Sequence, residues 1–280
     1  MKLIDFTKLS PNHKRMRQTL QAVAIPAFED NYIWLLHDKT QAIVIDPGDD
    51  VPIRDTLQAL RLNLQAILIT HHHHDHVDGV AGLLHHFPHA QVFAPDASDD
   101  FSYHFAYQAV REQSNLLMPF ELNKNRLHFN VLEVPGHTLD HVAYVLNVQD
   151  ETWLFCGDTL FGAGCGRLFE GSPTQMLDSL KKLCQLPTQT KVFCTHEYTL
   201  KNIQFARQLE PENTALIERE KVTKLLREKN LPSLPSTIAL ELATNPFLRC
   251  QTQTIKRAVQ APQATELEVF TKVRTWRNHF

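Results

Sequence analysis

The feature that most constrains this chain is a histidine-rich segment, residues 70–79, which reads Thr-His-His-His-His-Asp-His-Val-Asp-Gly. Five of the sixteen histidines fall within six positions here. Residues 66–70 form a short run of mostly apolar, partly β-branched side chains, which is typical of a buried strand. Apolar residues then recur at helical spacing as far as Pro88. The segment is therefore predicted to be a loop between a strand and a helix, where open α/β sheets place ligand-binding groups.

The spacing within this segment favours metal binding. Imidazole and carboxylate are the usual ligands of zinc, iron or manganese in proteins. His71 and His73 are two positions apart, so in an extended segment they point to the same side. Asp75 and His76 follow where the chain turns into the helix, and they can face a second point. One loop can thus serve two metal ions, with further ligands from elsewhere in the chain.

A histidine run can also occur in a chain without a structured metal site. An engineered tag is usually terminal and uninterrupted, and a low-complexity metal-buffering tract does not usually lie between a clear strand and a clear helix. A structured metal site is therefore the favoured interpretation. Within it, His72 and His74 are interpreted as spacers or supporting residues rather than ligands.

Three later residues that can bind metal each follow an apolar strand pattern. His137 follows residues 127–134, Asp158 follows residues 152–156, and His196 follows residues 191–194. Strand ends at one edge of a sheet can converge although they are far apart in sequence. A structural role is common for a lone histidine at a strand end, but it does not readily explain three such residues together with the histidine-rich segment.

Length and pattern predict an α/β chain with a helical tail. The chain has 280 residues, of which 43% are hydrophobic and 21% charged, as in a globular protein with a substantial core. Strands are expected at 20–25, 31–36 and 41–45, then a helix at 51–62, which fits a mixed sheet with helices outside. Residues 95–123 are expected to be irregular, with Phe101, Tyr103, Phe105 and Tyr107 packed, and a flap that touches substrate is the alternative. A helix is expected at 173–186, and four more after residue 198, at 202–209, 214–229, 237–242 and 266–278.

Charge, cysteines and termini limit the function classes. A net charge of −3 gives no overall basic bias, so nucleic acid is not an expected partner. Five scattered cysteines without a C-x-x-C pair favour a reducing compartment. No segment has the length of a membrane span, and residues 1–18 lack the apolar core of a secretory signal. We expect a cytoplasmic protein. Residues 1–18 are interpreted as a disordered extension, and a physiological start at Met16 is the alternative.

The segment His71-x-His73-x-Asp75-His76 resembles the H-x-H-x-D-H motif of the metallo-β-lactamase superfamily. Three longer signatures, 157–167, 195–199 and 245–249, are similar to those of glyoxalase II, the hydroxyacylglutathione hydrolases. The resemblance covers residues 25–280. It implies a metallo-β-lactamase-like αββα sandwich over residues 19–198 and a C-terminal helical substrate-binding domain over residues 199–280.

The resemblance also implies a ligand set for two divalent metal ions, with zinc expected and iron or manganese as alternatives. One ion would be held by His71, His73 and His137, the other by Asp75, His76 and His196, and Asp158 would bridge them. Asp75 and Asp158 are assigned as the catalytic carboxylates.

The same resemblance implies substrate-binding residues, although this chain differs from some relatives at several of these positions. Arg167, Tyr198, Arg274 and Arg277 would bind glutathione. Some relatives have Lys where this chain has Arg167 and Arg277, and Arg offers a bidentate fork that Lys lacks. Some have Tyr where this chain has Phe169, so a polar contact there is in doubt while packing remains.

The implied activity is hydrolysis of S-2-hydroxyacyl-glutathione thioesters. S-D-lactoylglutathione would give glutathione and D-lactate through a metal-bridging hydroxide, the second step of methylglyoxal detoxification. The expected partner is this small molecule, with no nucleic acid and no membrane, and the protein is expected to be a monomer.

Three alternatives stay open at this point. A sulfur dioxygenase of the same superfamily would use one iron and lack some second-site ligands and the helical tail. A class B β-lactamase would carry a secretory leader and typically Cys or Arg at second-site positions. A metal-binding or nucleic-acid-binding module would show no thioesterase activity when loaded with metal.

Overall fold

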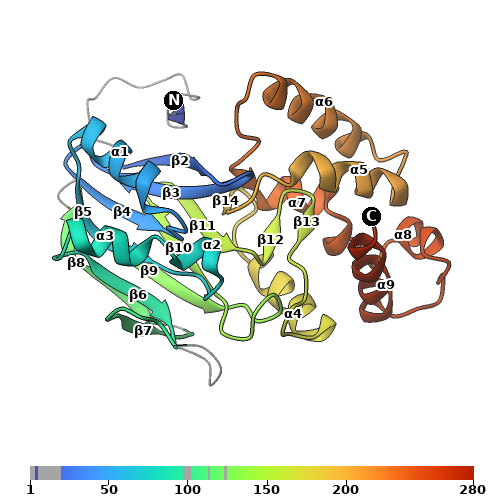
Figure 1. Ribbon diagram of the computed structural model, residues 1–280. Helices are drawn as coiled ribbons and strands as arrows, with labels where there is room; N and C mark the ends of the chain where they lie inside the picture. The colour runs from blue at the N-terminus through green and yellow to red at the C-terminus, as the bar shows by residue number, and fades with distance from the viewer. Residues whose placement is uncertain (1–3, 6–19, 97–101, 113, 123–124) are drawn as a thin grey trace. The chain divides into compact units, whose positions relative to one another are not determined.

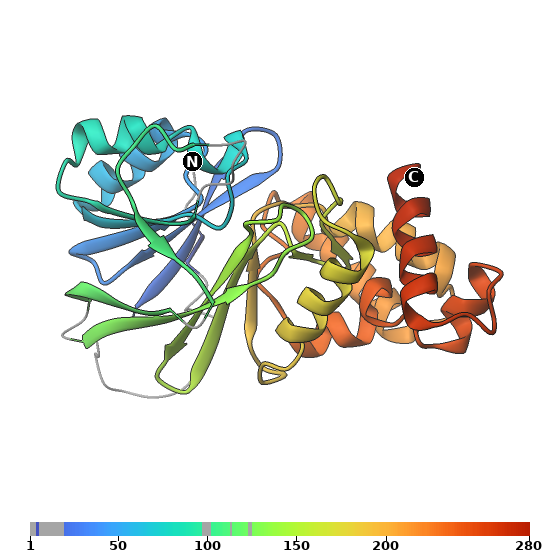
Figure 2. The same ribbon diagram turned by 90° about the horizontal axis from the view of Figure 1, so that it is seen from below.

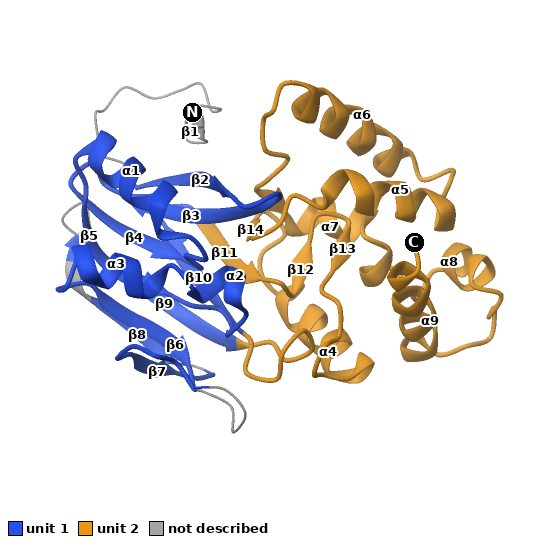
Figure 3. Cartoon of the chain, in the orientation of Figure 1, with its two compact units in different colours: residues 1–132, 142–150 blue, residues 133–141, 151–280 orange. Residues whose placement is uncertain are grey.

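The computed structural model describes residues 4–5, 20–96, 102–112, 114–122 and 125–280. They form two compact units, one of residues 1–132 and 142–150 and the other of residues 133–141 and 151–280 (Figure 3). Of the predicted N-terminal extension, Ile4 and Asp5 pair with the first long strand, and the rest lies outside the described residues. The predicted domain boundary at residues 198 and 199 stays a prediction.

The first unit is built on a seven-stranded sheet in which the strands follow one another in chain order (Figure 1). Its strands are β1 Ile4–Asp5, β2 Gln21–Ala27, β3 Asn31–His37, β4 Gln41–Ile45, β5 Asn63–Leu68, β6 Gln91–Pro95 and β7 Gln108–Val110. The early pairs are antiparallel, and those from β4 to β7 are parallel. The expected meander followed by strand–helix alternation is confirmed for these elements.

Among the described residues of this unit there are three helices, namely α1 Asp50–Leu60, α2 His74–Val77 and α3 Val80–His86. Asp49 caps α1 by accepting a hydrogen bond from the Val51 backbone nitrogen. Ile53, Leu57, Val80 and Leu83 are fully or almost fully buried in one apolar cluster with the sheet. This packing holds the β5–α2 connection, on which the histidine-rich segment lies, against a rigid layer.

Three more strands of the first unit have the order β10-β9-β8. In Figure 2 these strands, in green, form a layer that faces the blue strands of the first sheet. They are β8 Asn115–Leu122, β9 Asn125–Glu133 and β10 Val142–Val148. The Tyr144 hydroxyl on β10 donates to the Ile69 carbonyl oxygen at 2.8 Å, just after β5. Burial raises the pKa of Tyr144 well above its usual value, so it stays a neutral donor. These strands therefore lie against the first sheet.

The expectation that residues 95–123 are irregular is wrong in part. β7 and β8 lie within this range, and β8 pairs antiparallel with β9. Tyr103, Phe105 and Tyr107 are partly buried against the core of the first unit, which supports packing as their role. Phe101 lies outside the described residues.

The second unit combines short strands with most of the helices. Strands β11 Glu151–Gly157, β14 Lys191–Cys194 and β15 Ser236–Thr237 have the order β15-β14-β11, and β12 Leu160–Phe161 pairs with β13 Gly164–Cys165 as a hairpin. The helices are α4 Pro173–Leu183, α5 Thr199–Leu209, α6 Thr214–Glu228, α7 Ile238–Thr244, α8 Gln253–Ala258 and α9 Glu266–Asn278, with a 3₁₀ turn at Pro246–Leu248. Among the described residues, no helix has the length and apolar character needed to cross a membrane.

The helices of the second unit begin at local signals that the sequence contains. Ser172 and Thr265 form capping boxes at α4 and α9, and Asn213 caps α6. The predicted helices start and end within a few residues of those observed. Helix α8 was not predicted, because six residues carry too little periodicity to be recognised.

Candidate metal centre

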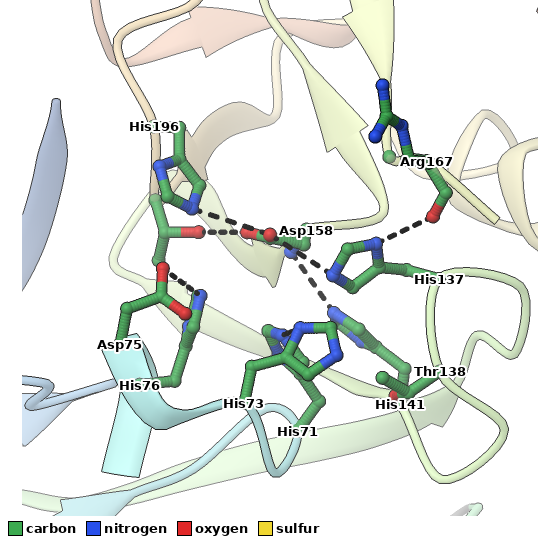
Figure 4. Close-up of polar contacts among 12 residues, drawn as sticks. His71, His73, Asp75, His76, His137, Thr138, His141, Asp158, Arg167 and His196 are labelled. Carbon is green, nitrogen blue, oxygen red and sulfur yellow. Dashed lines mark hydrogen bonds and ion pairs between the residues drawn. The ribbon is translucent and has the colours of Figure 1, made fainter. Parts of the chain in front are cut away.

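The first unit carries four side chains that can bind metal, two in the connection after β5 and two in helix α2 (Figure 4). His71 and His76 are fully buried, whereas His73 and Asp75 are half-buried. The Nε2 atom of His71 lies 3.1 Å from Nδ1 of His73, and Nε2 of His76 lies 3.5 Å from an Asp75 oxygen. Nitrogen and oxygen atoms that can bind metal thus gather in one short segment, as the spacing predicted.

Neighbouring polar groups orient these ligands. Asp46, directly after β4, accepts hydrogen bonds from the Thr70 backbone nitrogen at 2.7 Å and hydroxyl at 2.8 Å. Its Oδ2 also lies 3.2 Å from Nδ1 of His76. Since Nδ1 faces this carboxylate, Nε2 is the nitrogen directed toward Asp75. Asn31 donates to Asp75 at 2.9 Å, which fixes that carboxylate in turn.

The second unit carries three further side chains that can bind metal, His137, Asp158 and His196, all of which are buried. The same Asp158 oxygen, Oδ2, lies 3.3 Å from Nε2 of His137 and 3.4 Å from Nε2 of His196 (Figure 4). The other oxygen accepts a hydrogen bond of 2.6 Å from the Thr195 hydroxyl. A carboxylate oxygen between two imidazole nitrogens is the arrangement expected of a shared ligand.

Two hydrogen bonds fix the groups around Asp158. His137 donates from Nδ1 to the Arg167 carbonyl oxygen at 2.7 Å, so its Nε2 keeps the lone pair that faces Asp158. The buried His141 accepts the Asp158 backbone N–H on Nε2 at 3.1 Å. The first bond leaves His137 with a lone pair on Nε2 that can bind a metal ion, and the second fixes the backbone of Asp158.

The ligand atoms fit divalent metal ions by their chemistry. Each unit offers imidazole nitrogens and a carboxylate, with no thiolate among them, and such sets accept zinc, iron or manganese. His74 is exposed and pairs with Asp78, the residue that follows α2, at 3.1 Å, and His72 is half-buried. The expectation that neither is a ligand stays a prediction.

The residues predicted to bind glutathione all belong to the second unit. The Tyr198 ring stacks on His196 with 4.7 Å between ring centroids, and the Arg167 side chain lies over Phe169, itself exposed beside His137. Burial lowers the pKa of Arg277, and the nearby Arg274 and Arg167 lower it further. The second unit therefore concentrates positive charge near Tyr198, which suits an anionic ligand.

The two arginines of α9 differ in environment. The Arg274 guanidinium is buried, lies 5.0 Å from the centre of the Phe247 ring, and donates to the Cys165 carbonyl oxygen at 2.8 Å. Arg277 is half-buried and donates to the Asn202 side-chain oxygen at 3.1 Å. A direct substrate contact is thus easier for Arg277 than for Arg274.

Sequence reasoning missed four residues that support the ligands. They are Asn31, Asp46, His141 and Thr195. Asp46 follows an apolar strand just as Asp158 does, and Thr195 comes directly before His196. The strand-end pattern was therefore a usable signal for Asp46 and Thr195, whereas nothing local distinguishes Asn31.

Comparisons with known proteins identify the family of the chain. Residues 27–196 match the family model of the metallo-β-lactamase superfamily, and residues 197–280 match that of the hydroxyacylglutathione hydrolase C-terminus. The chain is 51% identical to the hydroxyacylglutathione hydrolase of Methylobacillus flagellatus, over 93% of this chain and 99% of that protein. The chain belongs to the hydroxyacylglutathione hydrolase family.

Solved structures support the fold that family membership implies. The BLEG-1 B3 metallo-β-lactamase is 24% identical, with a TM-score of 0.58 over 80% of this chain and 98% of that one. ETHE1 from Myxococcus xanthus is 23% identical, with a TM-score of 0.59 over 92% of this chain and 97% of that one. The predicted fold class, a metallo-β-lactamase fold with a C-terminal helical domain, is confirmed, and the chain is a metal-dependent hydrolase.

Proposed function

We propose that this protein hydrolyses S-2-hydroxyacyl-glutathione thioesters, with S-D-lactoylglutathione as the typical substrate. The observation that carries the proposal is the Asp158 carboxylate, whose Oδ2 lies within 3.4 Å of two imidazole nitrogens. Family membership supplies the substrate class, because the M. flagellatus relative is named a hydroxyacylglutathione hydrolase. The products would be glutathione and a 2-hydroxy acid.

Seven residues are proposed to hold two metal ions. His71, His73 and His137 would bind one, Asp75, His76 and His196 the other, and Asp158 both. When bound, such ions lower the pKa of water and stabilise negative charge on a carbonyl oxygen. Asp46 and the Arg167 carbonyl hold His76 and His137 with Nε2 available, so neither ring must reorient to bind. Zinc is the proposed ion, with iron or manganese as alternatives.

The glutathione moiety is proposed to bind near Tyr198. Glutathione carries two carboxylates and one ammonium, so its net charge is negative, and Arg167 and Arg277 would pair with it by charge-assisted hydrogen bonds. The leaving thiolate has an intrinsic pKa of about 8.5, so it needs little help from a general acid. The reaction can therefore proceed without a separate acid among the named residues.

We also propose a cellular compartment and an oligomeric state for the enzyme. Four of the five free cysteines are buried and none forms a disulfide, which fits a reducing compartment such as the cytoplasm. We propose that the chain works there as a monomer, and sedimentation of the metal-loaded protein tests its oligomeric state.

The function is tested by metal analysis together with a thioester hydrolysis assay. The wild-type protein is expected to hold two ions per chain and to hydrolyse S-D-lactoylglutathione. Asp158→Ala removes the shared carboxylate, so it is expected to lower metal content and to reduce kcat at least about a thousandfold. A single ion in fully active wild-type protein would contradict the two-ion site, and metal-loaded protein without thioesterase activity would contradict the function.

A further inference from the structure

The β12–β13 hairpin, residues 160–165, lies beside the proposed metal ligands of the second unit. Gly166 follows it, and its nitrogen donates to the Thr159 carbonyl oxygen at 3.1 Å. A Cβ on Gly166 would lie 2.0 Å from the Asp158 carbonyl oxygen and 3.2 Å from Nδ1 of His137. The next carbonyl, that of Arg167, accepts the His137 hydrogen bond. Moving the end of this hairpin would therefore move both Asp158 and His137.

Side chains from the C-terminal helices bind the backbone of the hairpin. Asn245 donates from Nδ2 to the carbonyl oxygens of Gly164 at 2.9 Å and Phe161 at 3.3 Å. Glu241 accepts the Ala163 N–H at 2.8 Å. These contacts take up backbone groups that a tight turn leaves without partners in the strand ladder.

Two further side chains complete this support. Asn202 on α5 donates to the Gly162 carbonyl oxygen at 3.1 Å. Arg274 on α9 donates to the carbonyl oxygens of Cys165 at 2.8 Å and Gly166 at 3.3 Å. Helices α5, α7 and α9 thus all take part in holding a segment of six residues.

The support is itself rigid and buried. Glu241 and Asn245 are completely buried, and their side chains are 3.1 Å apart. The Arg219 guanidinium, with a side chain only 4% exposed, donates to Glu241 at 2.6 Å and to Thr244 at 2.6 Å. A buried ion pair of this kind is costly to desolvate, so it is weak evidence for stability. Its hydrogen bonds hold the Glu241 side chain beside Asn245.

We propose that Glu241 and Asn245, together with Asn202, are positioning residues that hold Asp158 and His137 in place through the hairpin. The helical tail would then shape the metal site as well as the substrate site. This inference rests on the proposed metal-binding role of Asp158 and His137. It assigns a task in the reaction to residues that do not touch substrate or metal.

The test compares two substitutions of the same kind in the zinc-loaded full-length protein. Asn245→Ala removes the donors to the hairpin carbonyls. Asn213→Ala is the matched control, because Asn213 caps α6 and donates to the Ala243 carbonyl at 3.0 Å, and the hydrogen bonds described for it do not reach the hairpin. Both variants are expected to lower Tm, since each loses buried or capping hydrogen bonds.

Only Asn245→Ala is expected to change the metal site. Partners that orient metal ligands typically change metal affinity by 10–100-fold, so zinc affinity measured by chelator competition should fall about tenfold. kcat should fall by a similar factor, while the Asn213→Ala protein stays within about twofold of wild type. Equal zinc affinity and equal kcat in the two variants, measured well below both Tm values, would overturn the proposal.

A second variant keeps the test decisive if Asn245→Ala does not fold. Asn202→Ala removes one hairpin donor, and zinc affinity is expected to fall at least about threefold, whereas unchanged affinity would overturn the proposal. The wild-type protein separates this inference from the proposed function. Wild-type protein without two zinc ions or without thioesterase activity contradicts that function, whereas an active wild type with unaffected variants contradicts only the positioning role.

Discussion

At the scale of single residues, the oxygen partners of the histidine rings decide which nitrogen can bind metal. His76 faces Asp46 with Nδ1, and His137 donates from Nδ1 to a backbone carbonyl. In both cases Nε2 is left facing a carboxylate of the proposed ligand set. Burial removes competing water, so the orientation is fixed before any ion binds.

Asp46→Asn tests this orientation directly. The amide can still accept from the Thr70 N–H through its oxygen, but its NH₂ group would then face His76 and cannot accept the Nδ1 proton. We expect metal affinity to fall about 10–100-fold, measured by chelator competition. Asp38→Asn is the control, because Asp38 is also buried but accepts hydrogen bonds from the turn at Thr40 and Gln41. Equal metal affinity in both variants would contradict the role of Asp46.

Replacing each of the two arginines of α9 by alanine is expected to change different kinetic constants. Arg277→Ala is expected to raise KM about tenfold and leave kcat unchanged, because it removes contacts made equally in the ground and transition states. Arg274→Ala leaves buried carbonyls without a donor, which costs about 1.5–3 kcal/mol of stability, and it loosens the hairpin as well. We therefore expect a lower Tm and a lower kcat for Arg274→Ala. Thermal unfolding and steady-state kinetics measure both, and identical behaviour of the two variants would contradict the distinction.

At the scale of elements, the β5–α2 connection places alternate residues in different surroundings. His71 is buried in the bend that follows β5, His73 is the residue before α2, and His76 is buried within α2. The backbone at Gly48 lies close to that of Asp75, and a side chain there would not fit, since a Cβ on Gly48 would lie 1.9 Å from the Asp75 carbonyl oxygen. The segment is thus held from β4 as well as from its own ends.

Substituting the two intervening histidines tests the register of this segment. His72→Gln and His74→Gln are each expected to keep full metal content, because His74 points to solvent beside Asp78 and the proposed ligand spacing omits both. His73→Gln is the positive control and should lower metal content. Elemental analysis that found one ion lost from the His72 or His74 variant would show that the register is wrong.

At the scale of the whole molecule, burial protects the thiols. Burial raises the pKa of Cys156, Cys165, Cys194 and Cys250, and it raises that of the half-buried Cys184 to about 11. Since the thiolate is the nucleophile, a raised pKa leaves few reactive sulfurs at pH 8.

Alkylation of the native protein is therefore expected to be slow. Iodoacetamide at pH 8 should label Cys184 first and the other four only after unfolding, as counted by intact mass. Activity should survive the native treatment, because no thiol belongs to the proposed metal or substrate groups. Rapid native labelling of Cys165 with loss of activity would contradict this expectation.

The sequence alone determined the types and order of the proposed ligands and the elements that carry them. The spacing of His71, His73 and His76 between a strand and a helix is a local pattern. The strand ends before His137, Asp158 and His196 are local patterns too. Such patterns arise from the backbone periods of strands and helices, which a single chain displays directly. Strand β8, by contrast, was missed, because its apolar residues are consecutive rather than alternating and Pro119 interrupts them.

Only the tertiary structure decided how the supporting residues act. Asp46, Asn31 and His141 reach their partners across long sequence separations, and hydrogen-bond partners of that kind have no period in the sequence. Arg274 and Arg277 look alike on one helix face, yet one is buried against the hairpin carbonyls and the other only half-buried. Burial depends on everything packed around a side chain, so it separates residues that the sequence cannot distinguish.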